Sequence, residues 1–205
     1  MKNLSMSQPV KYLSDRHGTR PLLRRLTGRL AALGVALLLA MAAGCSTLTS
    51  TPVVTADAAQ GWALLPINNL SETPQADSQA LTLVETRLRA HGVQRLDTYA
   101  PMQQVALRTL LDPGARIDEA IDWARQSGYR YGITGTVSEW HYKAGADREP
   151  VVGMSLTLLD VVSGEVLWQA NASRTGWGYR GLPAVADSVI AQLLDKVRLV
   201  NTRSR

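Results

Sequence analysis

Several segments of the chain place apolar residues at the three-to-four-residue spacing of an amphipathic helix. Glycines stand just beyond two of them, at Gly92 and Gly128, where helices commonly end, and Pro183 fits the first turn of the last one. The helices are expected over residues 77–90, 102–111, 117–124 and 182–200.

Other segments carry apolar residues in short runs or at every second position, as β-strands do. The turn sequence Ser163-Gly164 separates the last two of them and predicts a hairpin. Strands are expected over residues 62–66, 93–99, 129–143, 150–162 and 165–173. This order predicts an α/β (α+β) fold, with a single mixed β-sheet packed by helices and a C-terminal antiparallel hairpin followed by a final helix.

The N-terminal segment has the pattern of a secretory signal. Arginines up to Arg29 precede residues 30–43, an uncharged run of 14 residues, which is shorter than the about 20 residues that a membrane span needs. Small residues then lead to Cys45, the only cysteine. This arrangement resembles the bacterial lipobox, although Ala42 stands where leucine is usual, and the resemblance implies that Cys45 is acylated, with palmitate among its lipids. Two or more acyl chains hold a protein stably on a membrane.

The sequence therefore divides into four parts. A lipoprotein signal peptide is expected over residues 1–44, the lipidated Cys45 with a flexible tether over 45–60, a single globular α/β domain over 61–200 and a basic tail over 201–205. In lipoproteins of this kind, Ser46 after the cysteine implies the periplasmic face of the outer membrane.

Charge is distributed unevenly along the chain. The whole sequence has a formal net charge of +5, but residues 45–195 hold 11 basic and 16 acidic side chains, a net charge of −5. The basic surplus belongs to the two ends, so the domain lacks the positive surface that a nucleic-acid-binding protein needs.

Residues for catalysis or metal binding are sparse. The acylated Cys45 leaves no thiol, three histidines form no cluster with a cysteine, and no serine stands in a nucleophile elbow. Residues 176–181 fit G-x-G-x-x-G, but the strand before them belongs to a hairpin, which excludes a dinucleotide fold. We expect no enzyme, no catalytic residue, no metal and no cofactor.

Trp177 and Tyr179 stand in a glycine-rich loop between the last strand and the last helix. Such aromatics either cover the core or are exposed for a contact. Because tryptophan and tyrosine suit the membrane–water boundary, a lipid-anchored protein makes a membrane contact a credible alternative.

The runs at 131–143, 145–150, 163–168 and 174–177 resemble the PelC family, outer-membrane lipoproteins of Pel exopolysaccharide secretion in biofilms. The resemblance implies a dodecameric ring that guides a cationic, partly deacetylated amino-sugar polymer to the outer-membrane porin PelB. It also implies an acidic role for Asp147 and a membrane contact for Trp177. Glu149 and Tyr179, each two residues further on, are assigned to the same two roles.

Two other functions remain open. The chain could activate a peptidoglycan synthase, or serve another secretion complex, as an interaction module. A tether over 46–60 would then span about 50 Å at most, at roughly 3.5 Å a residue. It could also be a periplasmic hydrolase that uses the carboxylates of Asp147 and Glu149.

Overall fold

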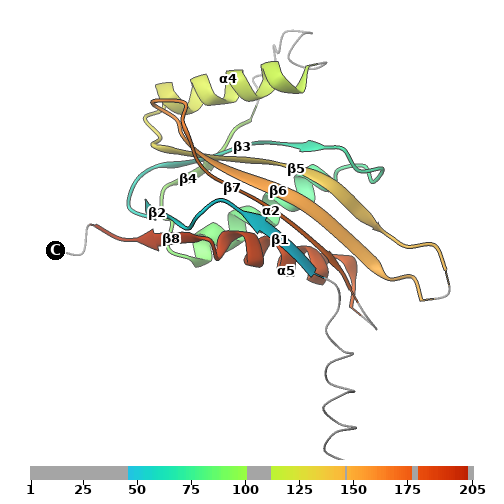
Figure 1. The fold of residues 1–205 in the computed structure, drawn as a ribbon. Helices are drawn as coiled ribbons and strands as arrows, with labels where there is room; N and C mark the ends of the chain where they lie inside the picture. The colour runs from blue at the N-terminus through green and yellow to red at the C-terminus, as the bar shows by residue number, and fades with distance from the viewer. Residues whose placement is uncertain (1–45, 101–111, 146, 177–179, 203–205) are drawn as a thin grey trace, which may run out of the picture. The chain divides into compact units, whose positions relative to one another are not determined.

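A six-stranded mixed sheet forms the centre of the domain in the computed structural model, which describes residues 46–100, 112–145, 147–176 and 180–202 (Figure 1). Its strands run in the order β1-β7-β6-β5-β3-β4. They are β1 (Ser46–Ser50), β3 (Trp62–Asn69), β4 (Leu96–Thr98), β5 (Tyr131–Tyr142), β6 (Pro150–Asp160) and β7 (Val166–Thr175). The expected mixed sheet is confirmed, with β5, β6 and β7 as antiparallel neighbours and β3 parallel to both β4 and β5.

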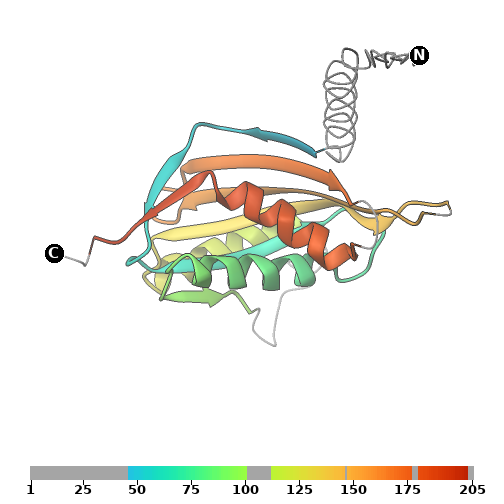
Figure 2. The ribbon, with the colours of Figure 1, turned by 90° about the horizontal axis from the view of Figure 1, so that it is seen from below.

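Helices cover both faces of this sheet. The helices α2 (Ala76–Ala90) and α5 (Leu182–Leu194) pack on one face and α4 (Pro113–Gln126) on the other (Figures 1 and 2). The helix expected over 77–90 is confirmed, and Gly92 follows its end with a φ of 97°. The helix expected over 102–111 lies outside the described residues.

The helix expected over 117–124 begins earlier than its apolar pattern indicates. Asp112 is its N-cap, and the carboxylate accepts hydrogen bonds from the backbone N–H of Gly114 at 2.9 Å and of Ala115 at 3.4 Å. Asp-Pro-Gly is also a turn sequence, so only the cap geometry decides that a helix begins here.

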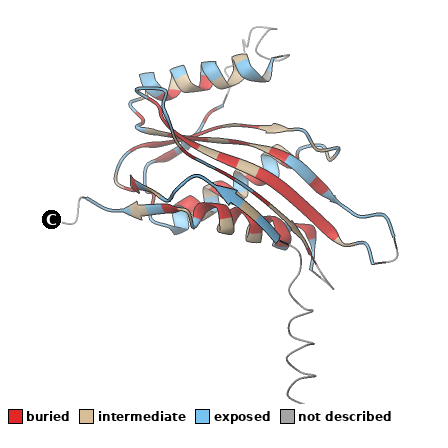
Figure 3. Cartoon of the chain, in the orientation of Figure 1, coloured by how far each residue is buried: buried red, intermediate tan, exposed pale blue. Residues whose placement is uncertain are grey.

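The larger core lies between the sheet and the pair α2 and α5 (Figure 3). Trp62, Trp140 and Trp168 are each at most 1% exposed within it. A smaller core under α4 includes Tyr99 and Tyr129, with Trp123 partly buried against them. The structure thus assigns Trp140 of β5 to the core.

The flexible tether expected over 45–60 is wrong for the described residues 46–60. β1 pairs antiparallel with β7 over five residues, from Ser46 opposite Arg174 to Ser50 opposite Ala170. The serine- and threonine-rich composition suggested a flexible tether. These residues also suit an edge strand, because one face and the outer edge of such a strand lie in water. Leu48, on the inner face, packs against the larger core.

The final helix is shorter than the expected 182–200. α5 ends at Leu194, and β8 (Val197–Val200) pairs in parallel with β2 (Val54–Asp57) in a separate two-stranded sheet. Val197 would lie on the apolar face of the expected helix, and it is equally suited to a buried position in a strand. The partner strand, about 140 residues earlier in the chain, decides between the two.

Candidate functional site

The pairing of β1 with β7 brings the described neighbours of two predicted sites to one end of the sheet. Cys45, Trp177 and Tyr179 themselves lie outside the described residues. Their described neighbours are Ser46, which begins β1 opposite Arg174, and Gly176, which follows the end of β7. Consecutive Cα atoms are about 3.8 Å apart, so the predicted lipidation residue precedes Ser46 in the chain by one peptide unit, on its N-terminal side. An anchor and a membrane contact at the same end are geometrically compatible.

Side-chain hydrogen bonds hold β1 in place. The hydroxyl oxygens of Thr47 and Ser173 lie 2.8 Å apart, and the Ser46 hydroxyl donates to the Gln192 side chain on α5 at 3.1 Å. Thr51, which follows β1, makes a further hydrogen bond to β7, in which its hydroxyl oxygen accepts from the backbone N–H of Gln169 at 3.1 Å. The segment after the predicted lipidation site therefore belongs to the folded domain.

Gly176 closes the corner between β7, β6 and α5. Its backbone N–H donates to the Pro150 carbonyl oxygen at 2.7 Å. A Cβ atom at this position would lie 2.6 Å from both Pro150 Cγ and Val185 Cγ2, closer than such atoms pack. Only glycine fits this corner without movement of Pro150 or Val185.

We expect Gly176→Ala to lower the free energy of unfolding by about 1–3 kcal/mol, because the added methyl group overpacks a buried corner. Urea unfolding of the variant measures this loss. Gly181→Ala is the matched control in the same loop, since its Cβ atom would meet only Pro183, at 3.7 Å. Equal midpoints for the two variants would contradict the close packing at Gly176.

Tyr142 connects the β5–β6 hairpin to α5. Its hydroxyl oxygen accepts a hydrogen bond from the backbone N–H of Leu182 at 3.1 Å, which satisfies one free donor at the start of α5. The ring is 46% exposed, and the Arg148 guanidinium lies 5.9 Å from its centre.

The two predicted acidic residues lie in the tip of this hairpin, at the same end of the sheet. Glu149 is half-buried and forms an ion pair with Lys143, with Nζ and Oε2 3.0 Å apart. Asp147 is exposed, and in the described part of the chain its carboxylate forms no ion pair. Asp147 is thus the carboxylate that is free to attract a cation.

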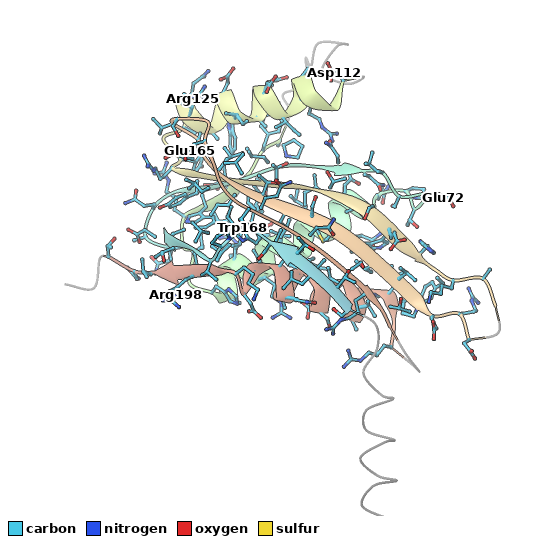
Figure 4. All side chains as sticks on the ribbon, in the orientation of Figure 1. Glu72, Asp112, Arg125, Glu165, Trp168 and Arg198 are labelled. Carbon is cyan, nitrogen blue, oxygen red and sulfur yellow. The ribbon has the colours of Figure 1, made fainter. Side chains whose placement is uncertain are left out.

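Further exposed carboxylates that sequence reasoning did not single out lie on α4. Asp118, Glu119 and Asp122 are all exposed there, and only Asp122 has an ion-pair partner among the described residues, Arg125. Figure 4 shows Asp112 and Arg125 at the two ends of this helix. The net charge of the domain indicated an acidic surplus, and the packing of α4 places part of the exposed carboxylates on this helix.

The described residues show no assembly for metal binding. No three side chains among His, Cys, Asp and Glu lie close enough there to hold an ion. His91 is the C-cap of α2, and His141 is exposed on β5. No described helix combines the length and hydropathy that a membrane span needs. The strand before residues 176–181 is antiparallel, as the sequence indicated.

Comparison with solved structures identifies close relatives. A PelC dodecamer from Paraburkholderia phytofirmans matches with 33% identity and a TM-score of 0.64, over 76% of this chain and 100% of that one. A leucine-to-methionine variant of that dodecamer matches with 35% identity and a TM-score of 0.65, over the same shares.

The LpoB C-terminal domain from Salmonella enterica matches at 18% identity and a TM-score of 0.40, over 58% of this chain and 84% of that one. At this distance the likeness supports no functional argument. Searches of family models and of curated proteins find no match.

Proposed function

This chain belongs to the PelC family, and from that membership we propose that it is an outer-membrane lipoprotein of Pel exopolysaccharide secretion. In this role it forms an oligomeric ring on the periplasmic face and guides a cationic polymer by electrostatic attraction to the export channel, PelB. The observation that carries the proposal is the 33% identity over the complete length of a subunit that was solved as a dodecamer.

A ring suits this domain because charge adds up around an opening. Residues 45–195 have a net charge of −5, and a single copy of that charge gives a weak field. Twelve copies around one axis would focus the field at the mouth and concentrate a polycation there without tight binding. Asp147 and the carboxylates on α4 are among the exposed groups that would contribute to such a field.

The proposed role needs no catalytic residue, and none is assigned. A hydrolase that uses Asp147 and Glu149 is not favoured, because Glu149 is neutralised by Lys143. Activation of a peptidoglycan synthase is not favoured either. Such an activator needs a long tether across the periplasm, and here residues 46–50 belong to β1.

The lipid anchor and the ring can be tested together. We expect the acylated protein to sediment with outer membranes and to give a single high-mass oligomer in native mass spectrometry. Cys45→Ser should release it from the membrane and abolish polymer export, because the acyl chains supply the binding energy. The domain should remain folded by circular dichroism.

Monomers alone from the acylated protein would contradict the ring. Normal export from the Cys45→Ser strain would contradict the anchored role.

A further inference from the structure

One face of the central sheet is covered by a helix only at one end. There α4 packs over β3 (Figure 1), and Leu159 and Val161 belong to the smaller core beneath it. The helices that pack on β6 and β7 lie on the opposite face, so the rest of this face, over β5, β6, β7 and β1, is open in the described part of the chain.

The side chains of this open face are almost all uncharged. Strand pairing places Thr49, Asn171, Ser155 and Thr136 in one row and Gln169, Thr157 and Thr134 in the next. A third row, Thr47, Ser173 and Gly153, ends on Glu139, the one charged side chain of the three. Their neighbours along the strands, such as Ala172 and Met154, lie in the larger core, so the rows point the other way. We call the residues of these rows the open face.

A second uncharged surface lies on the other side of the sheet, along α2. The exposed residues between positions 75 and 86 are Gln75, Ser78, Gln79, Thr82 and Thr86, which we call the α2 stripe. Threonine is a weaker helix former than glutamate or lysine, which suit helix positions that only meet water. The exposed face of α4, with Asp118, Glu119, Asp122 and Arg125, has the charged composition that α2 lacks.

Several hydroxyl groups on the two surfaces already have partners within the domain. On the α2 stripe, Thr82 donates to the Ser78 carbonyl oxygen at 3.0 Å and Thr86 to that of Thr82 at 2.8 Å. On the open face, Thr134 donates to the Pro66 carbonyl oxygen at 2.6 Å. A hydroxyl with an internal partner loses little when another surface displaces water, so both surfaces can be covered at low cost.

The charge of the domain indicates what covers them. Residues 45–195 have a net charge of −5, so two copies repel each other unless their charged groups stay away from the contact. The cores of protein interfaces are depleted of charged residues. Two uncharged surfaces on opposite sides of one domain suit a head-to-tail contact between identical copies, the type of contact that closes into a ring. A single different partner would need only one of them.

We propose that the open face of one copy packs on the α2 stripe of the next copy. The amide side chains of Gln169 and Asn171 then lie at the contact and supply hydrogen bonds to the neighbouring helix. That copies of this chain assemble rests on the proposed function, whereas the choice of the two surfaces rests on their composition and their position in the fold.

Substitutions that change an amide to a carboxylate test each surface without altering its shape. Asn171→Asp and Gln79→Glu should each raise the protein concentration needed for assembly at least about tenfold, because every contact then buries an unpaired charge. Gln126→Glu is the matched control, since Gln126 is exposed at the end of α4, outside both surfaces. Native mass spectrometry of the acylated mature protein over a dilution series measures the effect, and circular dichroism checks folding.

Chemical cross-linking tests whether the two surfaces meet. The variant with both Asn171→Cys and Gln79→Cys is treated with a short bismaleimide, and acylation leaves Cys45 without a thiol. The two positions lie on opposite sides of the sheet, so the reagent joins them only between copies. We expect a ladder of covalent oligomers in a denaturing gel, whereas either single variant should give no product larger than a dimer.

Normal assembly of both carboxylate variants would overturn the proposal, as would the absence of a ladder from the double variant. Equal weakening by Gln126→Glu would overturn it too, because total charge would then explain the effect. A ladder without a closed ring would support the two surfaces and contradict the ring of the proposed function, so the two failures are distinguishable.

Discussion

Gly135→Ala is expected to destabilise the domain by about 3 kcal/mol, the upper part of the range for overpacking a core. Gly135 lies in β5 opposite Leu156 of β6, in the middle of the longest strand pair. A Cβ atom there would come within 2.2 Å of the Ser155 backbone oxygen. A backbone atom cannot rotate away as a side chain can, so relief requires the two strands to separate locally.

Urea unfolding of the variant measures the loss, and a large part of the protein is expected in the insoluble fraction at 37 °C. Gly153→Ala is the matched control in the partner strand. Its Cβ atom would meet the movable side-chain ends of Ser138 at 2.9 Å and Glu139 at 3.2 Å. If the urea midpoint of Gly135→Ala equalled that of Gly153→Ala, the two strands would separate locally at little cost in free energy, and the prediction would be wrong.

Asp147→Asn is expected to lower polymer export about tenfold, the lower end of what electrostatic steering contributes to encounter rates. The substitution keeps the size of the side chain and removes one negative charge from every subunit of the proposed ring. Because Asp147 is exposed and unpaired in the described part of the chain, neither folding nor assembly should change. Export is measured as secreted polymer at equal protein level.

The ion pair beside Asp147 supplies a control for the mechanism. Glu149→Gln removes the same charge but leaves Lys143 uncompensated, so a summed field predicts a similar loss of export. The double variant Lys143→Gln with Glu149→Gln restores the net charge, and export should return to the parent level. Loss in Asp147→Asn together with full export in Glu149→Gln would exclude the summed field and indicate a direct contact at Asp147.

The predictions from the sequence were correct for elements whose signal lies within one segment of the chain. The helix over 77–90 and the hairpin around Ser163-Gly164 follow from side-chain spacing and turn chemistry, which neighbouring residues determine. The mixed sheet, which follows from the order of the expected strands, and the family resemblance, which rests on the runs between residues 131 and 177, are both confirmed. The assignments of Cys45, Trp177 and Tyr179 stay predictions, because these residues lie outside the described ones.

Tertiary structure decided what depends on distant partners. Residues 46–50 form β1 because β7 offers its edge, and 197–200 form β8 because β2 lies beside them. Neither segment carries a strand signal strong enough by itself. The same holds for charge: composition determined that the domain is acidic, but only packing decided that Lys143 neutralises Glu149 and that Asp147 forms no ion pair among the described residues. Strand pairing and burial bring together residues that are far apart in the chain, and a local sequence pattern does not show which distant residues will become neighbours.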